Sequence, residues 1–237
     1  MIKINSLNKI YNKKEKSRTI ALDNISFEVK EGEIISIVGK TGSGKTTLSN
    51  ILLGIVKPTE GEIIINDEIV INKKTKKKEL RKITEILLSS FQYPDHQLFK
   101  STVREEILFN NKEKEEEANK FIKMFNLPKE LLDKSPYRIS SGEKRKVLLI
   151  SILLREPKIL VLDESTAFLD PRSRREFVEM VKKINSELNT TIIFISHNLE
   201  DVKAISKKTL LIDQGKQVMF DKTNKVIKHY LGGDNNG

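Results

Sequence analysis

The octapeptide Gly39–Thr46 constrains the fold of this chain more than any other feature, because it reads Gly-Lys-Thr-Gly-Ser-Gly-Lys-Thr. The apolar run Ile34–Val38 precedes it, and a helical pattern over Lys45–Leu53 overlaps its end. Glycines between a strand and a helix let successive backbone N–H groups and the helix N-terminus point at one anion. The arrangement predicts a phosphate-binding loop in an α/β protein.

A nucleoside triphosphate is the ligand that this loop favours, the alternative being a glycine-rich turn with a chance lysine. Lys45 would bring a positive charge to the β- and γ-phosphates, and the Thr46 hydroxyl can ligate Mg²⁺. Lys45 is therefore also a candidate catalytic residue. The predicted nucleotide-binding residues of the loop are Gly39, Lys40, Thr41, Gly42, Ser43, Gly44, Lys45, Thr46 and Thr47.

Two acids, Asp163 and Glu164, end the apolar run that begins at Ile159. Apolar residues that lead straight into acids are typical of a central parallel strand ending at an active edge of the sheet. Asp163 would hold Mg²⁺ through water, and Glu164 would polarise the attacking water. The alternative is that both acids cap the next helix.

His197 follows Thr191–Ser196, another predicted strand that ends on a polar residue. A histidine at a strand end is by itself more often structural than catalytic. Beside two other strands that end in the same way, His197 is expected to contact the γ-phosphate and help to position the water.

Short apolar runs alternate with helical patterns along the chain, which predicts parallel strands joined by helices. Strand signals vanish between residues 93 and 156. We therefore predict a single domain over residues 1–237, with an α/β core (residues 1–92 and 157–237) and an inserted helical subdomain (residues 93–156). Further strands are predicted at Ile25–Val29, Ile63–Ile65, Ile86–Ser89 and Leu210–Ile212, and further helices at Thr102–Leu108, Glu115–Phe125, Glu143–Leu154, Arg172–Leu188 and Asn198–Ser206.

Composition excludes several classes of function. The chain has no cysteine, which excludes disulfides, thiol catalysis and zinc held by cysteine. The longest apolar stretch, Val147–Leu154, is far shorter than the ~20 residues that span a bilayer. The net charge is +10, and we interpret its densest run, Lys73–Lys82, as a solvated surface, with nucleic acid or anionic lipid as alternative partners. These features favour the cytoplasm.

The motifs together resemble the ATPase subunit of ATP-binding-cassette (ABC) transporters over essentially the whole chain. Gln92 stands where that family has its glutamine loop, and Ile139–Glu143 stands in the position of its signature motif, usually LSGGQ. Ser165–Asp170 matches the family's D-loop, and Tyr11 lies where an aromatic stacks on adenine. The signature also has a simpler explanation, since Ser140 followed by Glu143 forms a capping box at a helix start.

This resemblance implies a P-loop NTPase fold: a RecA-like, mostly parallel sheet core with an N-terminal antiparallel β region and an inserted helical subdomain. It implies that ATP is clamped between the phosphate loop of one chain and the signature of a partner ATPase in a head-to-tail dimer. The implied site residues are catalytic Lys45, Gln92, Glu164 and His197; magnesium-binding Thr46, Gln92 and Asp163; and nucleotide-binding Tyr11, Ser140, Ser141, Gly142 and Asp170.

Four positions depart from the family pattern, namely Ser141, Glu143, Ser165 and Phe168. Ser141 replaces a glycine of the signature, and Glu143 replaces its glutamine and adds a negative charge near a polyanion. These changes weaken the composite site built on this signature, and a dimer with a related but different ATPase would tolerate them.

The segment from Gln92 to Phe99 resembles the Q-x-P-x-x-Q-L-F stretch of energy-coupling factor (ECF) importers of vitamins or transition-metal ions. It implies a second ABC ATPase, a transmembrane coupling protein and substrate-binding membrane subunits as partners. Residues Asp95–Phe99 would line the groove for the membrane partner, at the cytoplasmic face of the cell membrane. The alternatives are another ABC importer or exporter ATPase, or a nucleic-acid-associated ABC protein, although no nucleic acid is expected.

Overall fold

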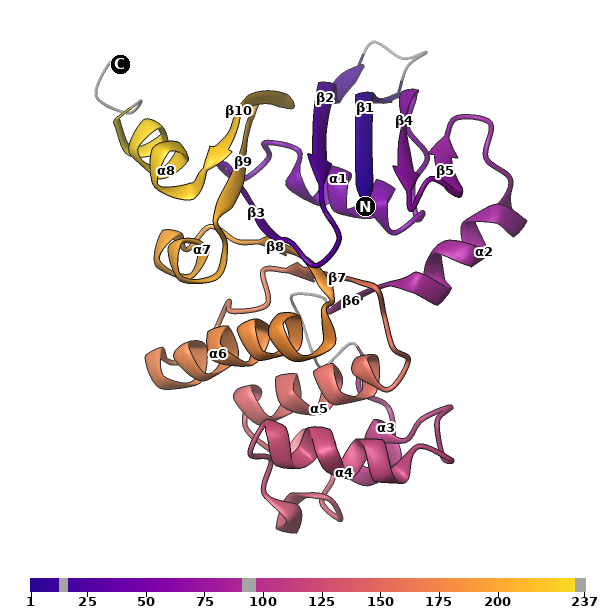
Figure 1. Cartoon of the computed structure of the whole chain (residues 1–237), viewed down its shortest axis with the longest axis vertical. Coiled ribbons are helices and arrows are strands. Elements are labelled where there is room, and N and C mark those ends of the chain that lie inside the picture. Colours follow the sequence, from indigo (N-terminus) through magenta and orange to yellow (C-terminus); the bar gives the residue numbers. More distant parts are fainter. Residues whose placement is uncertain (13–16, 91–96, 233–237) are drawn as a thin grey trace.

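The computed structural model describes residues 1–12, 17–90 and 97–232. Within them, ten strands form one mixed sheet in the order β5-β4-β1-β2-β10-β9-β3-β8-β7-β6 (Figure 1). The part from β9 to β6 is parallel throughout, as the alternating strands and helices predict. These five strands are β9 (Lys208–Asp213), β3 (Ile34–Val38), β8 (Thr191–Ile195), β7 (Ile159–Asp163) and β6 (Leu87–Ser90).

The other part of the sheet is antiparallel, as the family resemblance implies. It contains β5, β4, β1 and β2, and β10 joins it to the parallel part by pairing with β9 and, at Lys216, with Asp23 of β2. Strands β1, β5 and β10 were not predicted. In β1 the apolar alternation is broken, because Ser6 has a φ of +43° and the register with β2 slips between Ile4 and Leu7. The five strands are β1 (Ile2–Tyr11), β2 (Thr19–Val29), β4 (Glu60–Ile65), β5 (Ile69–Asn72) and β10 (Lys216–Lys222).

Helices cover both faces of the parallel part. Successive residues of β7 alternate between two apolar cores, with Leu160 in one and Val161 in the other. The first core packs α5 and α6 against the sheet, and the second packs α1 against the opposite face. The helices on these faces are α1 (Lys45–Leu52), α5 (Ser141–Leu153), α6 (Pro171–Leu188), α7 (Leu199–Ile205) and α8 (Thr223–Gly232).

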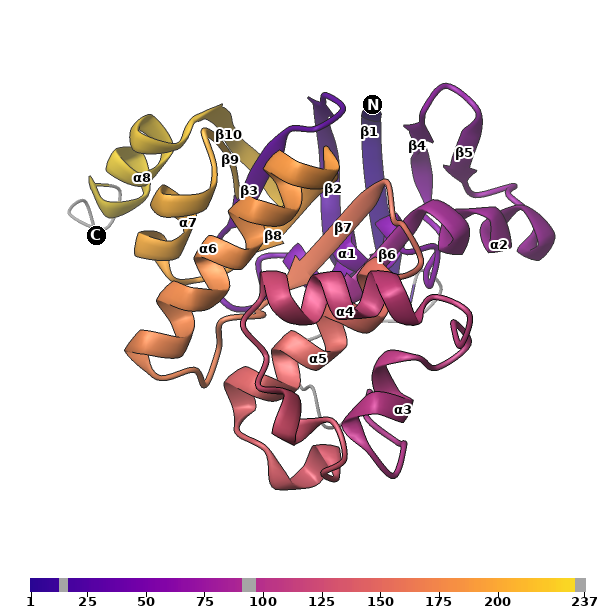
Figure 2. The same cartoon turned by 60° about the horizontal axis from the view of Figure 1, so that its bottom comes forward.

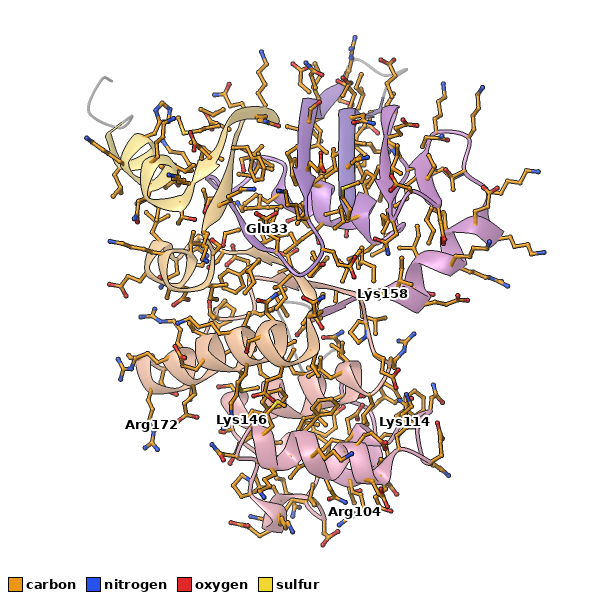
Figure 3. All side chains as sticks on the ribbon, viewed as in Figure 1. Glu33, Arg104, Lys114, Lys146, Lys158 and Arg172 are labelled. Atoms are coloured by element: carbon orange, nitrogen blue, oxygen red, sulfur yellow. The ribbon has the colours of Figure 1, made fainter. Side chains whose placement is uncertain are left out.

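Between β6 and β7, the described residues form helices and turns but no strand, and they pack as a separate layer below α6 (Figures 1 and 2). Besides α5, the layer contains α3 (Val103–Ile107), α4 (Glu115–Met124), η2 (Lys129–Leu131) and η3 (Pro136–Arg138). Lys114, labelled in Figure 3, links the start of α4 to the end of α5. Its Nζ donates to the Glu156 carboxylate at 2.6 Å and to the Leu154 carbonyl at 2.8 Å.

The basic run forms a helix that was not predicted, α2 (Lys77–Ile86). Its apolar side includes Ile83, which is buried in the second core, whereas Lys78, Arg81 and Lys82 are exposed. The predicted solvated surface is therefore one face of an amphipathic helix. In the part of the chain that the structure describes, none of the helices has the length and apolar character needed to cross a membrane.

Candidate active site

The Gly39–Thr46 loop joins β3 to α1, as predicted. A side chain at residue 39 would place its Cβ 2.1 Å from the Ile212 carbonyl oxygen, so only glycine fits there. Gly44 precedes α1 with a φ of +111°, in a region of backbone space that other residues rarely adopt. The loop thus depends on its glycines at both ends, and the α1 N-terminus opens toward the residues it encloses.

Lys45 reaches back over this loop. Its Nζ donates to the carbonyl oxygens of Gly39 at 2.8 Å and Lys40 at 3.0 Å. Burial lowers the pKa of Lys45, and the negative charges of Glu164 and Asp163 oppose that shift. A partly desolvated cation held beside two carboxylates is suited to meet an anion at this point.

Ser43 supplies an observation that bears directly on phosphate binding. The residue is buried, and its Oγ has no hydrogen-bond partner within the described part of the chain. A buried hydroxyl without a partner is costly unless a ligand satisfies it. Together with the open space around Gly42, where an added Cβ would meet nothing within 4 Å, this fits a phosphate group in the loop.

Asp163 ends β7 at the same edge of the sheet. In the strand register it lies opposite Ile195, the last residue of β8. Burial, assisted by the neighbouring charge of Glu164, raises the pKa of Asp163 to about 6, while Lys45 and a hydrogen bond from Ser49 act in the opposite direction. A buried carboxylate beside a phosphate-binding loop is a suitable oxygen ligand for Mg²⁺.

The raised pKa of Asp163 predicts how the stability of the ligand-free chain depends on pH. Between about pH 4 and 6 the folded chain holds a proton that the unfolded chain has released, so this stabilisation is lost as the pH rises through 6. Asp163→Asn, which is uncharged at every pH, should exceed the wild type in unfolding free energy by about 2 kcal/mol above pH 7. The difference should shrink toward pH 4.

Denaturant unfolding in EDTA without nucleotide, at pH 4.5 and pH 8, measures this difference. Asp201→Asn, at a second partly buried carboxylate whose pKa burial also raises, is the comparison variant. An Asp163→Asn chain less stable than the wild type at pH 8 would contradict the prediction.

Glu164 and His197 form a close pair. His197 Nδ1 lies 2.7 Å from Glu164 Oε2, and the Glu164 main-chain N–H donates to the Ile195 carbonyl at 2.9 Å. The Glu164 side chain is only 17% exposed, whereas that of His197 is 71% exposed. Glu164 has a φ of +48°, an uncommon backbone conformation for a residue other than glycine. The pair can orient a water molecule in front of the loop.

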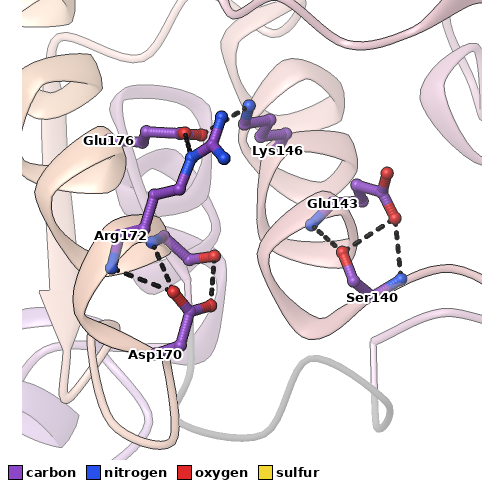
Figure 4. A network of polar contacts seen from close by, with 7 residues as sticks. Ser140, Glu143, Lys146, Asp170, Arg172 and Glu176 are labelled. Carbon is purple, nitrogen blue, oxygen red and sulfur yellow. Dashed lines mark hydrogen bonds and ion pairs between the residues drawn. The ribbon is translucent and has the colours of Figure 1, made fainter.

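The predicted signature residues begin α5, and the predicted capping box is confirmed. The Ser140 Oγ accepts from the Glu143 main-chain N–H, while the Glu143 carboxylate accepts from the Ser140 N–H at 2.8 Å and from its hydroxyl at 2.7 Å (Figure 4). Ser141 and Gly142 form the first turn. The exposed Ser140 hydroxyl is thus held by a carboxylate of its own helix.

Asp170 caps the neighbouring helix α6. Its carboxylate accepts from the main-chain N–H groups of Arg172 and Ser173 and from the Ser173 hydroxyl (Figure 4). These hydrogen bonds lower the pKa of Asp170, chiefly that from the Ser173 side chain. A Cβ added at Gly142 would lie 3.0 Å from the Ser173 hydroxyl, so the starts of α5 and α6 are in contact.

The structure therefore separates the predicted site residues into two groups. Lys45, Asp163, Glu164 and His197 gather at the carboxyl edge of the sheet. Ser140, Gly142 and Asp170 instead line a cleft of about 890 Å³ among α4, α5 and α6, whose lining includes no residue of the phosphate loop. Tyr11 ends β1, opposite Thr19 of β2, with the Lys9 ammonium 4.9 Å from its ring. Gln92 lies outside the described residues.

Three neighbours of these groups were not predicted. Ser49 hydrogen-bonds Asp163 from one turn into α1, Arg145 of α5 donates to the Ala167 carbonyl at 2.9 Å, and the Asp201 carboxylate hydrogen-bonds the Thr166 side chain. Each contact joins segments that are far apart in sequence. Thr166 and Asp201 come together because they follow the neighbouring strands β7 and β8. The sequence marks none of the three, since Arg145 stands within the charged run from Glu143 to Lys146.

The mixed sheet, the phosphate loop and the paired Glu164 and His197 define a P-loop ATPase of the ABC cassette class. Residues 22–167 match the family described as ABC transporter. The energy-coupling factor transporter ATP-binding protein EcfA2 of Acetivibrio thermocellus is 39% identical, over 96% of this chain and 82% of that protein. EcfA2 of Ligilactobacillus salivarius is 42% identical, over 88% of this chain and 74% of that protein. The chain belongs to the ABC transporter family and, within it, to the energy-coupling factor ATP-binding proteins.

Solved structures agree with this assignment. Clostridium perfringens cbiO1, part of the ABC transporter complex cbiONQ, has a TM-score of 0.85 and 29% identity, over 97% of this chain and 91% of that one. The cassette MJ0796, solved as a dimer in a post-hydrolysis state bound to ADP and Pi, has a TM-score of 0.80 and 28% identity, over 94% of this chain and 99% of that one.

Proposed function

We propose that this chain is the ATP-hydrolysing subunit of an ECF importer and couples ATP hydrolysis to uptake of vitamins or transition-metal ions. The observation that carries the proposal is the Glu164–His197 pair at the edge of the sheet that also holds Lys45 and Asp163. The identity with EcfA2 proteins over most of the chain supports the importer class.

In this proposal each residue at the sheet edge has a separate role in binding or hydrolysing ATP. The loop from Gly39 to Thr47 binds the phosphates, with Lys45 exchanging its two carbonyl contacts for phosphate oxygens. Glu164 orients the water for attack on the γ-phosphate, and His197 positions Glu164 and contacts that phosphate. Thr46, Asp163 and Gln92 would hold Mg²⁺, which neutralises phosphate charge when it is bound.

The second half of the site would come from another ABC ATPase. The cleft beside Ser140, Gly142 and Asp170 contains none of the phosphate-loop residues, and the related cassette MJ0796 was solved as a dimer. We propose that these residues, with Ser141, face the nucleotide held by a partner cassette. Tyr11 would stack on the adenine in the chain's own loop.

Glu143→Gln should strengthen this composite site. Glutamine keeps the capping acceptor of the helix while it removes a negative charge from the place where a partner's γ-phosphate would bind. We expect kcat/KM for ATP to rise about fivefold, which corresponds to about 1 kcal/mol. Steady-state hydrolysis by the wild type and by Glu143→Gln measures the change, with Glu113→Gln on the exposed surface as the control. A fall in kcat/KM would contradict the prediction.

The proposed membrane partners are a transmembrane coupling protein and the substrate-binding subunits it recruits, at the cytoplasmic face of the membrane. Of the predicted groove, Asp95–Phe99, the first two residues lie outside the described residues. Leu98 is buried, whereas Phe99 is 58% exposed and packs edge-on against Phe109. An exposed aromatic side chain at the end of this segment is suited to contact a hydrophobic helix of the membrane partner.

Affinity purification of the tagged chain from membranes tests the importer class. We expect a second ABC ATPase and a polytopic membrane protein to co-purify in stoichiometric amounts. Recovery without a membrane protein, together with ATP hydrolysis stimulated by added DNA or RNA, would overturn the proposal in favour of a nucleic-acid-associated ATPase.

A further inference from the structure

Arg145 is the largest fully buried side chain among the described residues, with an exposed fraction of 2%. It lies on α5, five residues after the Ser140 cap, on the side that faces the loop between β7 and α6. Burial lowers the pKa of Arg145 to about 10, so the guanidinium remains charged at neutral pH. A buried charge usually adds little stability or costs some, so its presence calls for an explanation other than stability.

The guanidinium reaches the loop that connects β7 to α6. Its Nη2 donates to the main-chain oxygen of Ala167 at 2.9 Å. This loop runs from Glu164, which is paired with His197, to Asp170, which caps α6. Arg145 therefore links the helix that starts with the signature to the loop that starts with the proposed base.

The loop needs support at this point. Glu164 and Phe168, on either side of Ala167, have positive φ angles of +48° and +63°. Such conformations are strained for large side chains and persist only where surrounding contacts fix them. Inside the loop, the Ala167 N–H donates to the Glu164 carbonyl at 3.0 Å, while the Phe168 side chain is 74% exposed.

An ion pair between α5 and α6 is more exposed than the Arg145 hydrogen bond and is therefore expected to be weaker. Lys146 Nζ lies 3.2 Å from the Glu176 carboxylate, which also pairs with Arg172 at 3.2 Å (Figure 4). Partly exposed ion pairs of this kind contribute little to stability. The buried hydrogen bond from Arg145 is the better candidate for fixing the geometry.

We propose that Arg145 is a positioning residue for ATP hydrolysis, because it fixes the 164–170 loop against α5. The position of Glu164 in the chain's own site is thereby fixed relative to Ser140, which would face the partner's site. The relation to the partner's site rests on the proposed pairing of cassettes. Arg145 itself touches neither nucleotide nor water in this role.

Arg145→Met and Arg145→Lys test the proposal, with Lys158→Met, at an exposed lysine just before β7, as the control. For Arg145→Met we expect kcat for ATP to fall about 10- to 100-fold while KM changes less than about threefold, since a misplaced base slows the chemical step and leaves the phosphate loop intact. Arg145→Lys, which can still donate to the Ala167 carbonyl, should recover part of kcat. Lys158→Met should stay within about twofold of the wild type, because the side chain is exposed and lies outside both groups of site residues.

Unfolding midpoints separate positioning from folding. Arg145→Met should unfold within about 4 °C of the wild type, because an apolar side chain replaces a buried charge. An Arg145→Met chain with wild-type kcat would overturn the proposal. Parallel losses of nucleotide affinity and unfolding midpoint in both Arg145 variants would overturn it too, by indicating a purely structural role.

The pairing of cassettes is tested separately in the same assay. The specific activity of the wild type should rise with protein concentration if two chains form each site. A specific activity independent of concentration, in a chain that sedimentation shows to be monomeric, would contradict the pairing and with it the coupling to Ser140. The comparison of kcat among the Arg145 variants would still decide whether Arg145 positions Glu164.

Discussion

Replacing Glu164 by Gln should leave ATP binding intact and slow turnover by about 10²- to 10⁴-fold, the usual contribution of a general base. Glutamine has nearly the same shape and can still contact His197, which lies 2.7 Å from the carboxylate. It loses only the ability to polarise water. The buried position of the Glu164 side chain, 17% exposed, means that no other solvent-facing acid easily takes its place.

Binding of a fluorescent ATP analogue and steady-state hydrolysis together measure this effect. Glu200→Gln, at an exposed carboxylate of α7, is the control and should hydrolyse ATP at the wild-type rate. Turnover near the wild-type value in Glu164→Gln would mean that the base has been assigned to the wrong residue.

Lys45→Met should weaken ATP binding about 10²-fold, because a charge-assisted contact with phosphate contributes about 1.5 to 3 kcal/mol. Lys45 is the cation that the loop holds toward its own carbonyls of Gly39 and Lys40. Burial lowers the pKa of Lys45, which means that keeping its charge in the folded chain carries a desolvation cost. Removing the charge also removes this cost, so the ligand-free variant should unfold close to the wild-type midpoint.

Isothermal titration with ATP and Mg²⁺ measures the affinity, and Lys30→Met, at an exposed lysine that follows β2, is the control. An affinity within threefold of the wild type would show that the loop binds nucleotide without this charge. A large drop in the unfolding midpoint would instead trace the lost binding to a damaged fold.

The parallel part of the fold follows from short-range patterns. Strands β3, β7 and β8 are mostly apolar runs that are followed directly by Gly39, Glu164 and Ser196, and their register aligns these ends at one edge. A sequence in which buried strands stop at polar residues therefore predicts both the sheet and the edge where its chemistry gathers. The capping box of Ser140 and Glu143 was predictable for the same reason, because its two residues are three apart on one helix.

What could not be predicted depends on tertiary contacts. The spacing of residues gives no sign that Gly142 lies against Ser173 or that Arg145 reaches the Ala167 carbonyl, because α5 and α6 meet only after the chain has passed through β7. Strand β1 escaped detection since its irregular register breaks the alternation of apolar residues. Helix α2 was not predicted because its charged residues, of both signs, outnumber its apolar residues.

The backbone conformation of Glu164 indicates a trade-off between ATP hydrolysis and conformational stability in this chain. Glycine or asparagine would adopt its left-handed conformation, with φ of +48°, more readily than glutamate does. Selection for thermal stability alone would thus favour losing the side chain that we propose activates water. A relative with glycine or asparagine at this position should be more stable but unable to hydrolyse ATP. It could still bind ATP as one subunit of a heterodimer.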